Sequence, residues 1–387
     1  MRKICIVTAN RSEYSRIKTI IDAIIEHPAL DLSVVATGSH LLEKYGNTIK
    51  DVKEDGVRID HQIYMELDGN NLCTMAKSIS VAISDLSTYF DNQKIDAVIV
   101  MGDRYEALSV AVAASVMNIP IAHVQGGEIT GTIDESIRHA ITKLAHIHFP
   151  ANEKSRERII RMGERPERVF SVGCPGTDLL LNAPQYARED VIMRINNKYV
   201  KDIESKIDTF KPFILCIQHP VTTEFGKNFD QIQETISALK KINNFQLIVL
   251  WPNIDAGAGD MALAIRRFQH DCKNNVFFMK HASHDIFVNL LRHAKCLIGN
   301  SSSGIREACY FGTPTVNIGT RQQYRDRGKN VMNVPYDRDA IYQAIEHQVG
   351  REKYEPEFLY GNGSAGEKIA NILAEIDLSQ IQKRNTY

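Results

Sequence analysis

The sequence lacks the features that mark disulfide-rich, membrane-spanning or nucleic-acid-binding chains. Its seven cysteines are scattered singly, without CxxC spacing, so neither a disulfide framework nor a structural zinc site is predicted. No apolar run approaches the roughly 18 residues of a membrane span, and the apolar stretch near the N-terminus is too short for a signal peptide. The net charge of −1 provides no attraction to nucleic acid or anionic lipid. We therefore expect a reduced, cytoplasmic protein.

Two common nucleotide-binding motifs are also missing. The turn after the first apolar run reads TANRSEYSR, which lacks GxGxxG spacing, and no GxxxxGK[ST] occurs anywhere. This excludes a standard NAD fingerprint and a P-loop. Arg11, at the start of the first helical segment, is a candidate phosphate ligand, and the alternative is that it is a solvated surface charge.

Short apolar runs instead alternate with helix-period segments along all 387 residues. Such alternation is typical of parallel sheets covered by helices on both faces. We predict an α/β protein with two doubly wound domains facing across a cleft. A segment rich in Pro and Gly, residues 173–184, marks the seam between them. The predicted domains are 1–177 and 178–362, followed by a C-terminal helix in 363–387. The apolar runs are 4–9, 32–37, 97–101, 119–124, 147–149, 169–172, 213–217, 245–251, 276–279, 296–298 and 315–318.

Residues 102–149 carry the clearest sign of catalysis. Asp103 directly follows one apolar run, and Glu128 and Asp134 lie on a Gly-rich loop after the next. Adjacent strands would bring these carboxylates together, which raises one pKa and supplies an acid and a base at neutral pH. Asp134 precedes a helix expected to begin near Ser136, so it could also be a plain N-cap. Arg138 follows on that helix and could orient the carboxylates or the substrate.

A second set of polar residues suits a nucleotide. The segment IGNSSSGIREA, residues 298–308, places serines and backbone N–H groups where a helix begins, and Glu307 could accept hydrogen bonds from ribose hydroxyls. His219 follows another apolar run and could reach a diphosphate, although a structural histidine is equally expected there. Asn253 and Asp255 follow a further run, in a segment that also reads as an ordinary turn.

Several of these segments together resemble the hydrolysing UDP-N-acetylglucosamine 2-epimerases of sialic acid biosynthesis, the NeuC type, and the epimerase half of the bifunctional animal enzyme. The resemblance runs over almost the whole length of the chain. It rests on NRSEYSRIK, ATGSHLLEKYGNT, GDRYEAL, GGEITGTIDESIRHAITKLAHIH, QHPVTTE, PNIDAG, IGNSSSGIREA and FGTPTVNIGTRQ.

The resemblance implies a GT-B-like pair of Rossmann-type domains, with the C-terminal helix returning to the first domain. It also implies a homodimer or tetramer and no dependence on bound NAD or metal. The reaction it implies is removal of the C2 proton of UDP-GlcNAc with loss of UDP, through a 2-acetamidoglucal. Addition of water then releases N-acetylmannosamine.

Carried over by motif, Asp103 and Asp134 are the acid/base candidates, with Glu128 beside them. Gln125 departs from the family pattern, because the resembled enzymes have glutamate or histidine at this position. Glutamine transfers no proton, so Gln125 is left a hydrogen-bonding role, and either Glu128 bears the proton transfer or the substrate differs. The residues expected to bind the substrate and UDP are Arg11, Arg104, Gln125, Arg138, His219, Asn253, Asp255, Ser301, Ser302, Glu307 and Arg321.

The leading hypothesis is therefore an enzyme that hydrolyses UDP-GlcNAc to N-acetylmannosamine and UDP for sialic acid synthesis. An alternative is a related hydrolysing 2-epimerase acting on a UDP- or GDP-linked 2,4-diacetamido-trideoxy sugar of the legionaminic type. A non-hydrolysing epimerase, a GT-B glycosyltransferase and a sugar-nucleotide sensor are the more distant alternatives.

Overall fold

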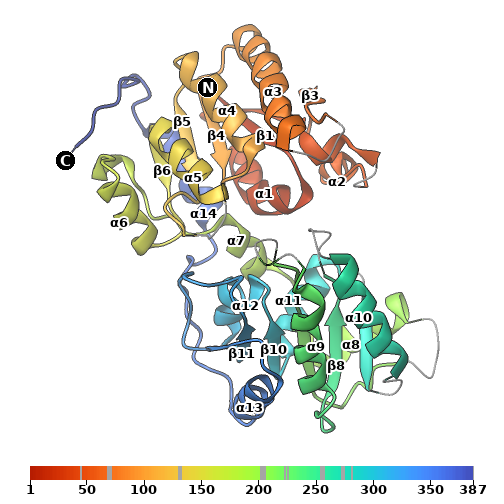
Figure 1. Ribbon diagram of the computed structural model, residues 1–387. Coiled ribbons are helices and arrows are strands. Elements are labelled where there is room, and N and C mark those ends of the chain that lie inside the picture. The colour runs from red at the N-terminus through yellow and green to blue at the C-terminus, as the bar shows by residue number, and fades with distance from the viewer. Residues whose placement is uncertain are drawn as a thin grey trace. The chain divides into compact units, whose positions relative to one another are not determined.

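The structure is a computed structural model, and it describes residues 1–43, 46–67, 72–129, 133–200, 206–221, 224, 226–252, 258–271, 275–279 and 282–386. The chain forms two compact units (Figure 1). Unit 1 comprises Met1–Asn182 and Tyr360–Tyr387, and unit 2 comprises Ala183–Leu359. None of the helices within the described ranges is both long and apolar enough to cross a membrane.

Unit 1 is built on a parallel six-stranded sheet of order β3-β2-β1-β4-β5-β6. This is the strand order of a Rossmann fold, with its topological switch point between β1 and β4. The strands are β1 Arg2–Thr8, β2 Leu30–Thr37, β3 His61–Ile63, β4 Ala97–Met101, β5 Ile121–Val124 and β6 Ile147–Phe149. The helices are α1 Arg11–Glu26, α2 Ile49–Glu54, α3 Leu72–Gln93, α4 Tyr105–Val116, α5 Ile133–Leu144, α6 Glu153–Arg161, α7 Pro175–Asn182 and α14 Ala365–Glu375.

Unit 2 repeats this topology with its own parallel six-stranded sheet, of order β12-β11-β10-β7-β8-β9. Read from the other edge it is again the Rossmann order, and the switch point lies between β7 and β10. The strands are β7 Phe213–Ile217, β8 Gln246–Leu250, β9 Val276–Met279, β10 Cys296–Gly299, β11 Thr315–Ile318 and β12 Val331–Val334. The helices are α8 Arg188–Tyr199, α9 Asn228–Leu239, α10 Ala258–Asp271, α11 His284–His293, α12 Ser303–Arg306, the 3-10 helix η6 Ala308–Phe311 and α13 Arg338–Val349.

Side-chain periodicity explains why the central strand of unit 1 is covered on both faces. Ile4 and Ile6 point into one apolar core, shared with α1 and α14, whereas Cys5 and Val7 point into the other, shared with α3 and α4. An apolar residue at every position is what a parallel strand between two helical layers requires. On α1, Ile17, Ile20, Ile21 and Ile24 are all fully buried, as their i, i+3, i+4, i+7 spacing predicts.

Three expectations about local structure were wrong. Residues 169–172 form no strand: Val169 makes only one isolated bridge, to His148, and the apolar side chains pack into the core beside the sheet edge. The edge strands β3 and β12 were missed because both are short and partly exposed and contain polar residues, as their sequences HQI and VMNV show. Helix α5 begins at Ile133, and Asp134 therefore lies inside its first turn. A carboxylate at this position stabilises a helix by interacting with the backbone N–H groups that have no partner within the helix.

The segment that leaves unit 1 is tied to the segment that re-enters it. The Asp178 carboxylate accepts hydrogen bonds from the backbone N–H groups of Ala365 (3.0 Å) and Gly366 (2.8 Å), which begin α14. The Cys174 N–H donates to the Tyr360 carbonyl at 2.6 Å. These contacts hold α14, drawn in blue among the red to yellow elements of unit 1, against α1 (Figure 1).

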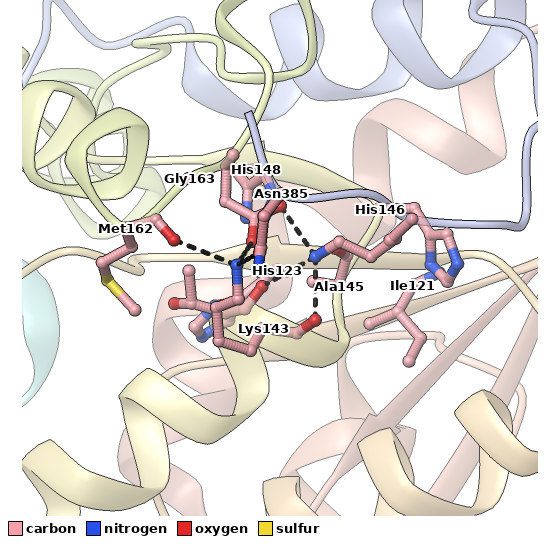
Figure 2. Close-up of polar contacts among 12 residues, drawn as sticks. Ile121, His123, Lys143, Ala145, His146, His148, Met162, Gly163 and Asn385 are labelled. Atoms are coloured by element: carbon pink, nitrogen blue, oxygen red, sulfur yellow. Dashed lines mark hydrogen bonds and ion pairs between the residues drawn. The ribbon is translucent and has the colours of Figure 1, made fainter. Parts of the chain in front are cut away.

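The C-terminal tail is held on unit 1 by a buried carboxylate. Glu164, whose side chain is 5 % exposed, accepts from Lys143 at 2.8 Å, Lys383 at 2.7 Å and His148 at 3.1 Å. Lys143 also donates to Asn385 and to the Met162 carbonyl, as Figure 2 shows. Burial opposes the charge on Glu164, but hydrogen bonds from His148, Lys143 and Lys383 lower its pKa to about 2.

Glu164→Gln is expected to destabilise the protein by about 3 kcal/mol at neutral pH, because a pKa lowered from 4.5 to about 2 makes the charged form stabilising. This stabilisation is complete above pH 4.5 and is lost as the pH falls toward 2. Urea unfolding of variant and wild type should therefore differ at neutral pH and converge in acid. Glu157→Gln, on the exposed face of α6, is the control. Equal stabilities at neutral pH would show that the ion pairs contribute nothing net.

Candidate active site

Two of the predicted acidic segments are joined on the carboxyl side of the unit 1 sheet. Asp103 follows β4, and a salt bridge joins it to Arg138 of α5, whose side chain is only 2 % exposed. The same guanidinium donates to the Glu128 carbonyl at 2.8 Å. One buried arginine thus joins the turn after β4 to the loop after β5. Asp134 lies one helical turn before Arg138 on α5, at i−4.

Gln125 occupies a strained position directly after β5. Its φ of +65° lies in the left-handed region that side chains other than glycine rarely adopt, and the residue is 3 % exposed. Its side-chain amide donates to the Cys174 sulfur at 2.9 Å. Backbone strain of this kind persists only where the surroundings hold it in place. The hydrogen-bonding role that the sequence left to Gln125 therefore includes a contact with the protein itself.

Neither of the two glycines after Gln125 has room for a side chain. A Cβ on Gly126 would lie 2.9 Å from His123 Nδ1, and one on Gly127 would lie 2.3 Å from the Ser155 carbonyl oxygen. Gly127 also has a φ of +75°. The loop that carries Glu128 is therefore pressed against an imidazole on one side and against α6 on the other.

Two further acidic residues meet in unit 1, and the sequence did not predict that they would. Glu13 of α1 and Glu106 of α4 line one small cavity at the carboxyl ends of β1 and β4. Arg104 binds both carboxylate oxygens of Glu106, at 3.0 to 3.2 Å. Burial, reinforced by the charge of Glu106, raises the pKa of Glu13 to about 8. Glu13 thus holds a proton at neutral pH. The sequence gives no sign of this, because Asn10-x-x-Glu13 is the pattern of an ordinary helix-capping segment.

The candidate nucleotide residues of unit 2 meet at its own switch point. His219 follows β7 and Asn300 follows β10, and they pair reciprocally: the His219 N–H donates to Asn300 Oδ1 at 2.7 Å, and Asn300 Nδ2 donates to the His219 carbonyl at 2.8 Å. Arg321 donates to the Asn300 carbonyl at 3.2 Å. Burial, and then the charge of Arg321, lowers the pKa of His219 to about 3, so its imidazole is neutral. Nothing in the sequence marks Asn300 beyond its place in the serine-rich turn.

The serine-rich turn does not cap α12 through the side chain of Ser302. The Ser302 hydroxyl makes no capping hydrogen bond, and Ser301 Oγ accepts only a 3.3 Å bond from the Ser303 N–H among the contacts of the described residues. Glu307 lies between α12 and η6, and its Oε2 is buried without a hydrogen-bond partner in the described part of the chain. A buried acceptor left without a donor costs free energy, which a ligand hydroxyl would recover.

Three of the expected ligands have no described side chain. Arg11 is the first residue of α1, but its side chain lies outside what the structure describes. Asn253 and Asp255 fall in residues 253–257, outside the described ranges. The remaining candidates are divided between the two units, Arg104, Gln125 and Arg138 in unit 1 and His219, Ser301, Ser302, Glu307 and Arg321 in unit 2.

Comparison with known proteins identifies the family. The model of the family described as UDP-N-acetylglucosamine 2-epimerase matches residues 22–374. The chain belongs to this family. It is 37% identical, over 100% of both chains, to the UDP-N,N'-diacetylbacillosamine 2-epimerase (hydrolyzing) of Legionella pneumophila. It is 34% identical to the GDP/UDP-N,N'-diacetylbacillosamine 2-epimerase (hydrolyzing) of Campylobacter jejuni, over 89% of this chain and 88% of the relative.

Solved structures of the 2-epimerase family share the fold. The crystal structure of UDP-GlcNAc 2-epimerase from Neisseria meningitidis, bound to UDP-GlcNAc, superposes with a TM-score of 0.77 at 17% identity, covering 97% of this chain and 100% of the other. The two parallel sheets with interleaved helices are therefore the GT-B-like architecture of this family, as the sequence predicted.

Proposed function

We propose that the protein is a hydrolysing 2-epimerase whose substrate is a UDP- or GDP-linked 2,4-diacetamido-trideoxy sugar, the alternative weighed in the sequence analysis. The observation that carries the reaction class is the Asp103 carboxylate held by a buried arginine beside the Glu128 loop. The substrate follows the two hydrolysing relatives named above, which act on N,N'-diacetylbacillosamine nucleotides and are 37% and 34% identical to this chain.

The proposed chemistry begins with removal of the C2 proton of the sugar by a carboxylate. The C1–O bond to the diphosphate breaks, the electron pair leaves with the nucleoside diphosphate, and a C1–C2 double bond forms. Water then adds its oxygen to C1 and gives up one proton to a carboxylate, while a carboxylic acid delivers a proton to C2 on the opposite face. Asp103, Glu128 and Asp134 are the proposed acids and bases, because Gln125 carries no transferable proton.

The proposed nucleotide ligands lie in unit 2. His219, Ser301, Ser302 and Arg321 would hold the diphosphate, and Glu307 would accept hydrogen bonds from the ribose hydroxyls. Asn253, Asp255 and, in unit 1, Arg11 complete this prediction, together with Arg104 and Arg138 near the sugar. Both UDP and GDP carry the same ribose and diphosphate, so these contacts suit either nucleotide. A homodimer or tetramer stays a prediction of the family resemblance, and a cytoplasmic location stays a prediction of the composition.

The proposal is tested by incubating the protein separately with UDP- and GDP-N,N'-diacetylbacillosamine and with UDP-GlcNAc in D₂O. We expect free nucleoside diphosphate, the 2-epimeric free sugar and deuterium at its C2, with the diacetamido sugar turned over fastest. Fastest release from UDP-GlcNAc, giving N-acetylmannosamine, would return the function to the sialic acid hypothesis. An epimerised sugar still attached to its nucleotide would contradict the hydrolytic mechanism.

Glu307→Gln is expected to weaken UDP binding by about tenfold or more, because a hydrogen bond to a charged acceptor contributes roughly 1.5–3 kcal/mol. Because Oε2 has no hydrogen-bond partner in the described part of the chain, this oxygen contributes little to the stability of the fold. Calorimetric titration with UDP checks the affinity, and thermal unfolding should change little. Glu346→Gln, on the exposed face of α13, is the control. Unchanged affinity in Glu307→Gln would remove Glu307 from the nucleotide site.

A further inference from the structure

A buried histidine lies directly beneath the turn that carries Asp103. His123, on β5, is fully buried, and its Nε2 lies 2.8 Å from the Gly102 carbonyl oxygen. Its Nδ1 lies 3.2 Å from the Thr142 hydroxyl of α5. The imidazole therefore spans the space between the end of β4 and the inner face of α5. Figure 2 shows His123 inside unit 1, near His148.

The surroundings determine the charge and the tautomer of this imidazole. Burial lowers the pKa of His123 to about 3; the Gly102 carbonyl and Asp103 oppose this change, and His148 and Arg138 reinforce it. A neutral imidazole has one donor and one acceptor nitrogen. Because the Gly102 carbonyl only accepts, Nε2 must carry the hydrogen. Nδ1 is then the acceptor, and the Thr142 hydroxyl is its donor.

The same imidazole borders both loops of the acidic site. Gly102 has a φ of +77°, so the chain turns sharply at the residue before Asp103. On the other side, the ring leaves no room for a Cβ on Gly126, two residues before Glu128. Asp134, Arg138 and Thr142 follow one another at i, i+4 and i+8 on α5, and therefore share one helical face. The turn before Asp103, the glycine before the Glu128 loop and the inner face of α5 thus all pack around this imidazole.

We propose that His123 is a positioning residue for Asp103: the Gly102 carbonyl accepts its Nε2–H and thereby sets the tautomer, and its Nδ1 accepts from the Thr142 hydroxyl. The proposal rests on the proposed function only in assigning proton transfer to Asp103. The imidazole touches no reacting atom, and its effect is to hold the Gly102–Asp103 turn in one orientation. A displacement of about 1 Å in a catalytic group costs up to roughly a hundredfold in rate, so a single hydrogen bond here has a measurable consequence.

The tautomer is tested directly by long-range ¹H–¹⁵N NMR of protein labelled at its 13 histidines. The His123 signals are assigned by their change in Thr142→Val, which removes the hydroxyl donor at nearly constant volume. We expect a neutral Nε2–H ring in the wild type at both about pH 5 and about pH 8. A charged ring, or the Nδ1–H tautomer, would overturn the proposal. This measurement needs no substrate, so it stands even if the proposed function fails.

The consequence for catalysis is tested with the same variant. Thr142→Val should lower kcat by about tenfold or more, with KM and the UDP dissociation constant within about twofold of wild type. Thr142→Ser, which keeps the hydroxyl, should recover most of the loss. Thr88→Val, on the exposed face of α3, controls for the substitution itself. An unchanged kcat in Thr142→Val, or equal losses in Thr142→Val and Thr142→Ser, would refute the positioning role.

Discussion

Asp103→Asn is expected to lower turnover by about 10²- to 10⁴-fold and to leave the UDP dissociation constant within about twofold of wild type. The amide keeps the shape of the carboxylate but can neither take nor deliver the C2 proton. UDP binding persists because the proposed nucleotide ligands lie mainly in unit 2. Single-turnover release of nucleoside diphosphate, with calorimetry for UDP, measures both quantities on the same preparation.

The fold of Asp103→Asn should survive, because Arg138 keeps the Glu128 carbonyl as an acceptor and the introduced side-chain amide still offers it an oxygen. Asp91→Asn, on the exposed face of α3, is the matched control and should turn over normally. Turnover near the wild-type rate in Asp103→Asn would exclude Asp103 as an acid or base. A parallel fall in UDP affinity would instead indicate that Asp103 binds the nucleotide.

The central strands were predictable because burial of both faces requires an apolar residue at nearly every position, and such a run is visible in the sequence. A parallel strand between two helical layers buries both faces, so β1, β4 and β7 read as continuous apolar runs. Edge strands need no such pattern, and β3, with the sequence HQI, escaped notice for that reason. Conversely, residues 169–172 are apolar because Val169 and Val172 are buried, although they form no strand. A short apolar run therefore indicates that its residues are buried, but not that they form a strand.

The sequence singles out a candidate side chain most readily where it follows a recognisable strand. Asp103 and His219 were proposed in this way, and each follows a strand that flanks the switch point of its sheet. Glu13, Asn300 and His123 were not, because their significance arises from partners far away in the chain. His123 stands in an apolar run, and only the contacts with Gly102 and Thr142 set it apart from a core residue. Contacts between residues far apart in the chain cannot be predicted from the spacing of residues within a short segment.

The two units share one strand order but carry different side chains at the ends of the corresponding strands. In each, polar residues follow the two strands that flank the switch point: β1 and β4 in unit 1, β7 and β10 in unit 2. Unit 1 supplies carboxylates and a buried arginine there, whereas unit 2 supplies a neutral histidine, an asparagine and serines. The first set suits proton transfer and the second suits a diphosphate and its ribose.

Arg138→Met is expected to lower turnover by about a hundredfold, because its guanidinium orients Asp103 and fixes the Glu128 backbone. Removing the charge also leaves Asp103 without its buried partner. The cost in stability is about 2 kcal/mol, below the 3–5 kcal/mol typical of a fully buried pair, because the Asp103 side chain is 28% exposed. Turnover and urea unfolding measure the two effects, with Arg161→Met, on the exposed side of α6, as the control.

Arg138→Lys separates the charge of Arg138 from its geometry. Lysine keeps one positive charge but lacks the planar fork that reaches two acceptors at once. If the fork is what matters, Arg138→Lys should lose at least about tenfold in turnover while recovering most of the stability lost in Arg138→Met. Full turnover in Arg138→Lys would show that a positive charge near Asp103 is sufficient, and the bridge to the Glu128 carbonyl would then have no role in catalysis.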